Sequence, residues 1–197
     1  IASCLVGSEM CIRDRLLAMV KRENKLKERK KIGILGGTFD PAHKGHLEIS
    51  KQAKKKFKLE KVIWAITRQN PLKTKSKSNL KDRIQFAKKF VSKNIFIKVK
   101  FYEDKINSNK TIDLIEHLNK NDKVEIYFIM GADNAINLHK WHKWKSIIKK
   151  CEIIVFDRKG YKSKSLRSVA FSSSFNKSLT FINFKKVNIS SSQLRKI

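Results

Sequence analysis

Two histidines stand three residues apart shortly after a pair of glycines. The stretch reads Gly36-Gly37-Thr38-Phe39-Asp40-Pro41-Ala42-His43-Lys44-Gly45-His46. Glycines allow backbone N–H groups to come close to a phosphate, because no Cβ stands in the way. A helix that begins here would add unpaired N–H groups and a partial positive charge, and the two imidazoles could donate to phosphate oxygens. The pattern predicts a site for the phosphates of a nucleotide.

A glycine pair after a strand is usually only a turn, and a single histidine usually has a structural role. Both features occur here at a fixed spacing, with Thr38, Asp40 and Pro41 between them. The apolar run 32–35 directly before them is typical of a buried strand. This combination favours the functional interpretation.

The rest of the chain predicts strands that alternate with helices. Expected strands cover residues 31–35, 62–66, 95–99, 124–129, 152–156 and 180–184. Expected helices run from Gly45 to about residue 57, from the cap Asn79 to 91, from the cap Thr111 to 118 and from Asp133 to 149, with another helix start at 190–197. The serine-rich residues 160–178 predict a long exposed loop. This alternation predicts an α/β fold, a Rossmann-like doubly wound parallel sheet with helices on both faces.

Parallel sheets of this kind bind ligands at the carboxyl ends of their strands, beside the point where the strand order reverses. Residues 36–46, 67–73 and 131–133 each follow an expected strand. We therefore expect these three segments to meet in one cleft. There, Gly131 would permit close approach of the backbone, and Asp133 would either accept a hydrogen bond from a ribose hydroxyl or cap a helix.

The chain is strongly basic, with 46 Lys and Arg against 17 Asp and Glu and a net charge of +29. Nucleic-acid binding is one interpretation of such a charge. Only nine of the basic residues are arginine, however, and the lysines are spread along the whole chain. This distribution favours lysines on solvated faces, whose positive field would also attract anionic nucleotides.

The cysteine pattern and the length of the apolar runs predict a protein of the cytoplasm. Cys4, Cys11 and Cys151 form no CxxC pair or zinc-type spacing, which fits a reducing compartment. No apolar run approaches the roughly 20 residues that cross a bilayer. We expect residues 1–30 to be a non-native or poorly ordered extension, with 1–15 derived from a sequencing adapter and Met19 as the natural start. Residues 31–197 would then form the domain, shortened at its C-terminal end.

The glycine–histidine stretch resembles the GTFDPxHxGH signature of the nucleotidyltransferase superfamily, and the double glycine makes it most similar to the nicotinate-nucleotide adenylyltransferases. Further stretches resemble that family's GADN…L…W…W, NPLK, RxG and ISSTxIR motifs, at residues 131–144, 70–73, 158–160 and 189–195. In the last of these, Ser192 replaces threonine and Leu194 replaces isoleucine. Residues 108–114 match the family's TxYTxDT stretch only in part, because Lys110 replaces the tyrosine and Leu114 the second threonine.

The resemblance implies transfer of an adenylyl group from ATP to nicotinate mononucleotide in NAD biosynthesis, with Mg²⁺ carried by ATP and not by protein side chains. It implies catalysis by His43, His46 and Arg195; ATP binding by Gly36, Gly37, Thr38, Phe39, Gly131, Asp133, Ser190, Ser191 and Ser192; and substrate binding by Asn70, Lys73, Thr111, Trp141 and Arg158. From the residues alone, Trp141 could equally fill the core.

Several alternatives stay open from the sequence. The acceptor could be nicotinamide mononucleotide or phosphopantetheine, or the chain could be a cytidylyl-transferring relative. More distantly, it could be a basic nucleic-acid-binding protein on the same scaffold, although we expect no nucleic acid and no membrane as partner. The oligomeric state is not predicted.

Overall fold

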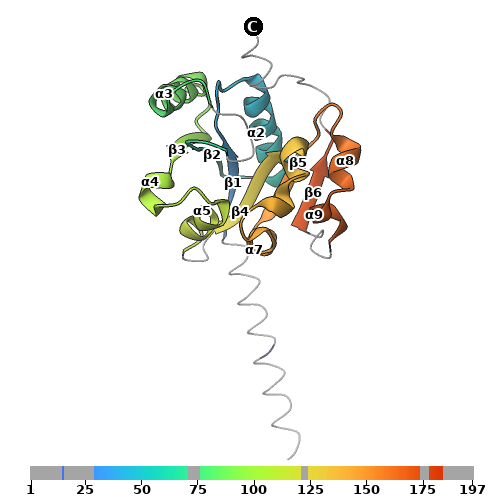
Figure 1. The fold of residues 1–197 in the computed structure, drawn as a ribbon. Helices are drawn as coiled ribbons and strands as arrows, with labels where there is room; N and C mark the ends of the chain where they lie inside the picture. The colour runs from blue at the N-terminus through green and yellow to red at the C-terminus, as the bar shows by residue number, and fades with distance from the viewer. Residues whose placement is uncertain (1–14, 16–28, 71–75, 121–123, 174–177, 184–197) are drawn as a thin grey trace, which may run out of the picture.

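The computed structural model describes residues 15, 29–70, 76–120, 124–173 and 178–183. Within these ranges the centre of the molecule is a six-stranded sheet of order β3-β2-β1-β4-β5-β6, in which every neighbouring pair is parallel (Figure 1). The strands are β1 (Lys30–Gly37), β2 (Lys61–Ile66), β3 (Ile97–Phe101), β4 (Val124–Gly131), β5 (Glu152–Phe156) and β6 (Leu179–Ile182). This sheet confirms the predicted Rossmann-like α/β fold. The strand order reverses between β1 and β4.

Helices lie between consecutive strands and cover both faces of the sheet. They are α2 (Lys44–Phe57), α3 (Leu80–Phe90), α4 (Glu103–Ile106), α5 (Thr111–Leu118), α6 (Ala132–Ala135), the 3₁₀ turn η1 (Leu138–Lys140), α7 (Trp144–Lys150), α8 (Lys162–Leu166) and α9 (Val169–Ser172). None of the helices in the described ranges is long and apolar enough to span a membrane.

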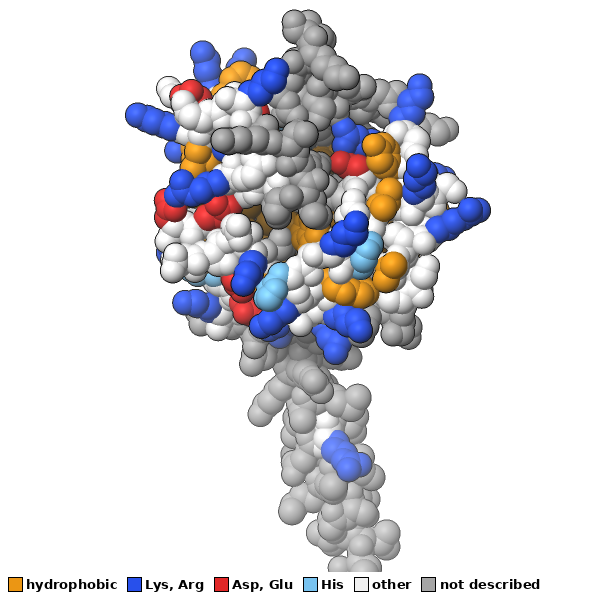
Figure 2. Space-filling model, viewed as in Figure 1, with side chains coloured by type: hydrophobic (Ala, Val, Ile, Leu, Met, Phe, Trp, Pro, Cys, Tyr) orange, Lys and Arg blue, Asp and Glu red, His pale blue; other side chains and the backbone are white. Residues whose placement is uncertain are grey.

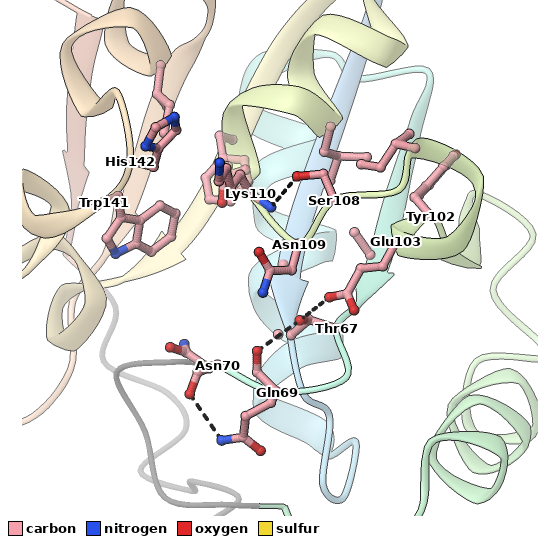
Figure 3. A pocket seen from close by; sticks show the side chains of 18 of the residues that line it. Thr67, Gln69, Asn70, Tyr102, Glu103, Ser108, Asn109, Lys110, Trp141 and His142 are labelled. Atoms are coloured by element: carbon pink, nitrogen blue, oxygen red, sulfur yellow. Dashed lines mark hydrogen bonds between the residues drawn. The ribbon is translucent and has the colours of Figure 1, made fainter.

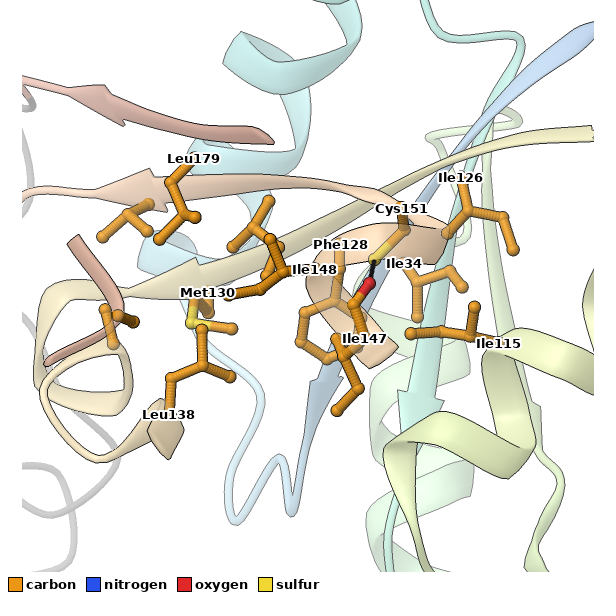
Figure 4. Packing of buried hydrophobic residues seen from close by; sticks show 14 of the residues in the cluster. Ile34, Ile115, Ile126, Phe128, Met130, Leu138, Ile147, Ile148, Cys151 and Leu179 are labelled. Carbon is orange, nitrogen blue, oxygen red and sulfur yellow. Dashed lines mark hydrogen bonds between the residues drawn. The ribbon is translucent and has the colours of Figure 1, made fainter. Parts of the chain in front are cut away.

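Two apolar clusters hold these helices to the sheet, one on each face. Successive side chains of a strand point to opposite faces, so Ile34 joins one cluster and its neighbour Leu35 joins the other. The first cluster packs β1, β4 and β5 against α5, α7 and α9, and Figure 4 shows Phe128 and Ile147 within it. The second packs the opposite face against α2 and α3. Burial on both faces explains why the strands are apolar runs and not alternating patterns.

Most expected elements are confirmed, but three expectations about their extent are wrong. The strand predicted at 95–99 lies two residues later, because Ile97 N–H closes a turn on Asn94 O and leaves Ile95 85% exposed. The helix predicted over 133–149 is divided into α6, η1 and α7, and Lys143 takes a left-handed backbone (φ 51°) directly before α7. The strand predicted at 180–184 begins at Leu179 and ends at Ile182.

The expected exposed loop at 160–178 is also wrong for its described part. Residues 162–166 and 169–172 form α8 and α9, and Ser165 and Ala170 are fully buried. Ala170 belongs to the first apolar cluster, so a serine-rich segment with few apolar residues still docks on the core. Thr111, predicted as a helix cap, is instead the first residue of α5, and the capping position belongs to Lys110, which makes no side-chain cap.

Lysine and arginine side chains are dispersed over the face shown in Figure 2, with acidic side chains between them at several places. This is the arrangement expected of solvated lysine faces.

Candidate active site

The candidate site lies at the carboxyl ends of β1, β2, β4 and β5. There the chain leaves β1 at Gly37, β2 at Ile66, β4 at Gly131 and β5 at Phe156. Because these ends lie at one edge of a parallel sheet, the segments that follow them meet around the reversal point between β1 and β4. Of the three segments expected in one cleft, Gly36, Gly37, Thr67, Gln69 and Asn70 line a cavity here, whereas residues 131–133 lie outside its lining.

His43 and His46 form a reciprocal cap at the start of α2. The Gly45 N–H donates to His43 Nδ1 at 3.1 Å, and the His43 N–H donates to His46 Nδ1 at 3.3 Å. This is the geometry of a capping box, with imidazole nitrogens where serine and glutamate usually stand. The two rings lie 3.9 Å apart between centroids. The spacing of the histidines therefore follows from the first turn of the helix.

The cap also decides which nitrogen of each ring can meet a ligand. An Nδ1 that accepts a hydrogen bond carries no proton, so the neutral imidazole carries its proton on Nε2. Burial and, second to it, the nearby positive charge of Arg158 lower the pKa of His43 from 6.5 to about 4. His43 is consequently neutral at pH 7 and can donate a hydrogen bond from Nε2.

The ring of Phe39 packs against the ring of His46. Its ring is 1% exposed and lies 4.7 Å from the ring of His46 and 4.9 Å from that of Trp64. The backbone at Phe39 is left-handed (φ 49°), which turns the chain from β1 toward α2. The buried ring leaves the backbone of Phe39 as the part that could meet a ligand, and its role in ATP binding stays a prediction.

Arg158 and Asp133 form an ion pair close to His43. Arg158 Nη1 lies 2.7 Å from Asp133 Oδ2. A Cβ at Gly131 would stand 2.6 Å from Asp133 Oδ1, so glycine is required if the carboxylate is to keep this position. Asp133 thus holds Arg158 on the histidine side of the site, where the positive charge of Arg158 helps to lower the pKa of His43.

A cavity of about 320 Å³ opens on the other side of the glycine pair, between β1, β2 and α5. It begins at Gly36 and Gly37 and extends to Thr111 and Trp141. Figure 3 shows Trp141 and His142 on one side, across from Lys110, Ser108 and Asn109. Trp141 stands edge-on to Phe128 at 5.9 Å, so it is at once a packed residue and a wall of the cavity.

Thr67 lies in the expected segment 67–73, but its contact with Glu103 in the cavity wall was not predicted. Glu103 accepts a hydrogen bond from the Thr67 hydroxyl (Figure 3). It also accepts from the Arg68 N–H, and the Arg68 side chain pairs with Asp104. Glu103 lies on the four-residue helix α4, which is too short for its periodicity to be recognised in the sequence. The other lining residues, which were not among the predicted binding residues, are Ala65, Ile66, Gln69, Tyr102, Ile106, Ser108, Asn109, Lys110, Leu114, Phe128, Asn134, Lys140, His142 and Ile147.

The structure divides the predicted site residues into two groups. Gly36, Gly37, Asn70, Thr111 and Trp141 line the cavity. His43, His46, Asp133 and Arg158 lie outside its lining, around the start of α2, with Thr38 and Gly131 at the strand ends beside them. The remaining predicted residues, Lys73, Ser190, Ser191, Ser192 and Arg195, lie outside the described residues.

Comparison with known proteins identifies the family of this chain. A family model described as cytidylyltransferase-like matches residues 34–197. A probable nicotinate-nucleotide adenylyltransferase of Pelagibacter ubique is 72% identical over 180 residues, which cover 91% of this chain and 100% of that protein. The chain belongs to the nicotinate-nucleotide adenylyltransferase family. A probable member from Clostridium botulinum is 33% identical, over 85% of each chain.

Solved structures of this family share the fold. A Plasmodium falciparum nicotinic acid mononucleotide adenylyltransferase complexed with NaAD aligns with a TM-score of 0.69 at 22% identity, covering 85% of this chain and 83% of that one. A nicotinate-nucleotide adenylyltransferase from Vibrio parahaemolyticus, described as putative, aligns with a TM-score of 0.57 at 19% identity, over 85% of each chain. The family resemblance stated from the motifs is thus confirmed over most of the chain.

Proposed function

We propose that this chain transfers the adenylyl group of ATP to nicotinate mononucleotide, releasing nicotinate adenine dinucleotide and pyrophosphate. The observation that carries the proposal is the cavity that begins at the glycine pair and ends at Trp141. It is open enough for a mononucleotide and offers an aromatic wall for the base at one end. Its other end lies beside the residues that lead to His43 and His46.

In this reaction the 5′-phosphate of the mononucleotide attacks the α-phosphorus of ATP, and the bond to pyrophosphate breaks in line with the new bond. The attacking phosphate is already ionised, so the reaction requires no general base. Positioning and stabilisation of the developing charge supply the rate. His43 and His46 would donate from Nε2 to oxygens of the α-phosphate and the leaving group, and the Gly37 and Thr38 N–H groups would assist them.

Other residues would balance the charge of the phosphates or bind them. Arg158, coupled to His43, would balance charge on the reacting phosphates, while Asp133 would hold Arg158 and accept from a ribose hydroxyl. Arg195 and Lys73 would neutralise pyrophosphate, and Ser190, Ser191 and Ser192 would bind the ATP phosphates. In the described part of the chain, no group of three or more His, Cys, Asp or Glu side chains could hold a metal ion. We propose that Mg²⁺ arrives with ATP as part of the substrate.

The charge of the cavity supports nicotinate over nicotinamide. Its described lining includes the two lysines Lys110 and Lys140, the imidazole of His142 and one carboxylate, Glu103. That carboxylate is already satisfied by Thr67 and Arg68. An additional negative charge on the base therefore meets a net positive lining, whereas a neutral carboxamide gains nothing from it.

A pyrophosphate-release assay with ATP and Mg²⁺ tests the proposal. Nicotinate mononucleotide, nicotinamide mononucleotide and phosphopantetheine are compared as acceptors at equal concentration. We expect the highest kcat/KM with nicotinate mononucleotide and formation of the dinucleotide in equal amount to pyrophosphate. Release that is faster with either other acceptor, or absent with all three, would contradict the assignment.

A further inference from the structure

Arg83, on α3, connects the two loops that border the candidate site. It is 4% exposed, and its guanidinium donates to main-chain carbonyls. Nη1 donates to Thr38 O at 2.6 Å and to Thr67 O at 2.8 Å, and Nη2 donates to Arg68 O at 3.0 Å. Nε donates to Ser78 O at 3.2 Å, just before α3. One side chain therefore joins the loop after β1, the loop after β2 and the start of its own helix.

These contacts begin where the strand ladder ends. The β1–β2 register ends with Gly37 opposite Ile66, and the Thr67 N–H makes the last bond to Gly37 O at 3.0 Å. Beyond it, Thr38 O and Thr67 O both accept from the same nitrogen of Arg83. Two carbonyls cannot bond each other, so a donor between them is needed to hold the loops together. A planar guanidinium with five N–H groups can serve several carbonyls at once, which a lysine ammonium on a flexible stem cannot do in this geometry.

A second contact connects the same elements in the reverse direction. Asp40 follows β1 and is 2% exposed, and its Oδ2 accepts from the Lys77 N–H at 2.7 Å. The loop after β1 thus holds the segment before α3, while α3 holds the loop after β1. Burial lowers the pKa of Arg83, and the negative charges of Asp40 and Glu103 oppose that shift. The charged arginine is therefore compensated by Asp40 in the loop after β1 and by Glu103 on α4.

We propose that Arg83 is a positioning residue, which fixes the loop after β1 against the loop after β2 and so aligns the two substrates for transfer. The inference rests on the proposed function. The loop after β1 leads into His43 and His46, while the loop after β2 supplies Gln69 and Asn70 to the cavity wall. ATP held by the first loop and mononucleotide held by the second must meet in line, and a misplacement of about 1 Å can cost about 100-fold in rate.

The test compares Arg83→Lys and Arg83→Met with Lys81→Met, which changes an exposed lysine of the same helix. Thermal unfolding and circular dichroism report the fold. Calorimetry gives the Kd of each nucleotide separately, with ATP and Mg²⁺ in one titration and nicotinate mononucleotide in the other. Steady-state kinetics gives kcat, and hydrogen exchange followed by mass spectrometry reports protection of residues 38–40 and 67–70.

We expect Arg83→Lys to remain folded and to bind each nucleotide within about threefold of the wild type, while kcat falls by about 100-fold. Exchange should accelerate in both loops together, and Lys81→Met should match the wild type in every measurement. The proposal is overturned if kcat is unchanged, if the two Kd values weaken as much as kcat falls, or if only one loop loses protection. Loss of the folded state in both Arg83 variants also overturns it, since the residue would then be part of the core. If the wild type does not turn over, the proposed function fails. The exchange rates of the two loops in the Arg83 variants would still show whether Arg83 connects them.

Discussion

Replacing His43 by asparagine keeps a capping side chain at the start of α2 but removes the titratable imidazole. Asparagine is among the best N-cap residues, so its side-chain oxygen can accept from the Gly45 N–H that His43 Nδ1 holds in the wild type. The start of the helix is therefore retained. The asparagine side chain has no group that titrates between pH 4 and 8.

The magnitude of the expected difference follows from the pKa of His43. Burial, with Arg158 as the second cause, lowers that pKa from 6.5 to about 4 in the folded protein. Between these two pH values the unfolded chain takes up a proton that the folded chain does not, so acidification favours unfolding. Stability from the neutral imidazole is complete above pH 6.5 and is lost as the pH falls to about 4. At about 1.4 kcal/mol per pKa unit, the loss amounts to about 3 kcal/mol.

Urea unfolding of the wild type and of His43→Asn, at intervals from pH 7.5 to pH 4, measures this difference. Both proteins lose stability from carboxylates that protonate, so the measured quantity is the change in the difference between their unfolding free energies. We expect the wild type to lose about 3 kcal/mol more than the variant across the interval. Parallel stability curves would refute the conclusion that His43 is neutral and buried in the folded state.

Three further substitutions test the site. His46→Ala should lower kcat by about 100- to 1,000-fold while the protein stays folded, because a donor to the phosphates is lost; near-normal turnover would remove His46 from the mechanism. Arg158→Gln should raise the pKa of His43, measured by NMR titration of its ring proton, because a nearby positive charge is removed; an unchanged pKa would show that burial alone sets it. Lys110→Glu should reduce the preference for nicotinate over nicotinamide mononucleotide, measured as a ratio of kcat/KM, by at least about tenfold. Lys145→Glu, the same charge change outside the cavity lining, is its control, and equal ratios in the two variants would contradict the role of Lys110.

The sheet and the location of the site could be predicted because their signals are local. Buried parallel strands are apolar runs, and β1, β2, β4 and β5 were each recognisable as such. Their carboxyl ends must lie at one edge, so topology alone predicts that residues 36–46, 67–73 and 131–133 meet there. The capping of α2 by His43 was not foreseen, although the histidine spacing that it explains was visible.

The contacts that hold the cavity wall and the loops beside it could not be predicted, because they join distant parts of the chain. Glu103 meets Thr67 across 36 residues, and Arg83 meets Thr38 across 45. In the sequence Arg83 is one of 46 basic residues, and it lies on a helix with an ordinary apolar stripe. The short helices α8 and α9 were missed for the opposite reason: their serines suggested solvent, while burial of Ala170 on the core decides their structure.

Because His43 is neutral, it would act on a phosphate differently from the many charged lysines of the chain. A buried neutral imidazole stabilises a phosphate as an oriented donor, and its strength depends on direction far more than a lysine charge does. That direction is set by the cap on α2, and the cap is delivered by the turn through Phe39, whose preceding carbonyl, Thr38 O, is held by Arg83. The dispersed lysines can attract nucleotides from any side, but they do not align them. We therefore propose that alignment in this site falls to a small set of buried groups: His43, Phe39, Asp40 and Arg83.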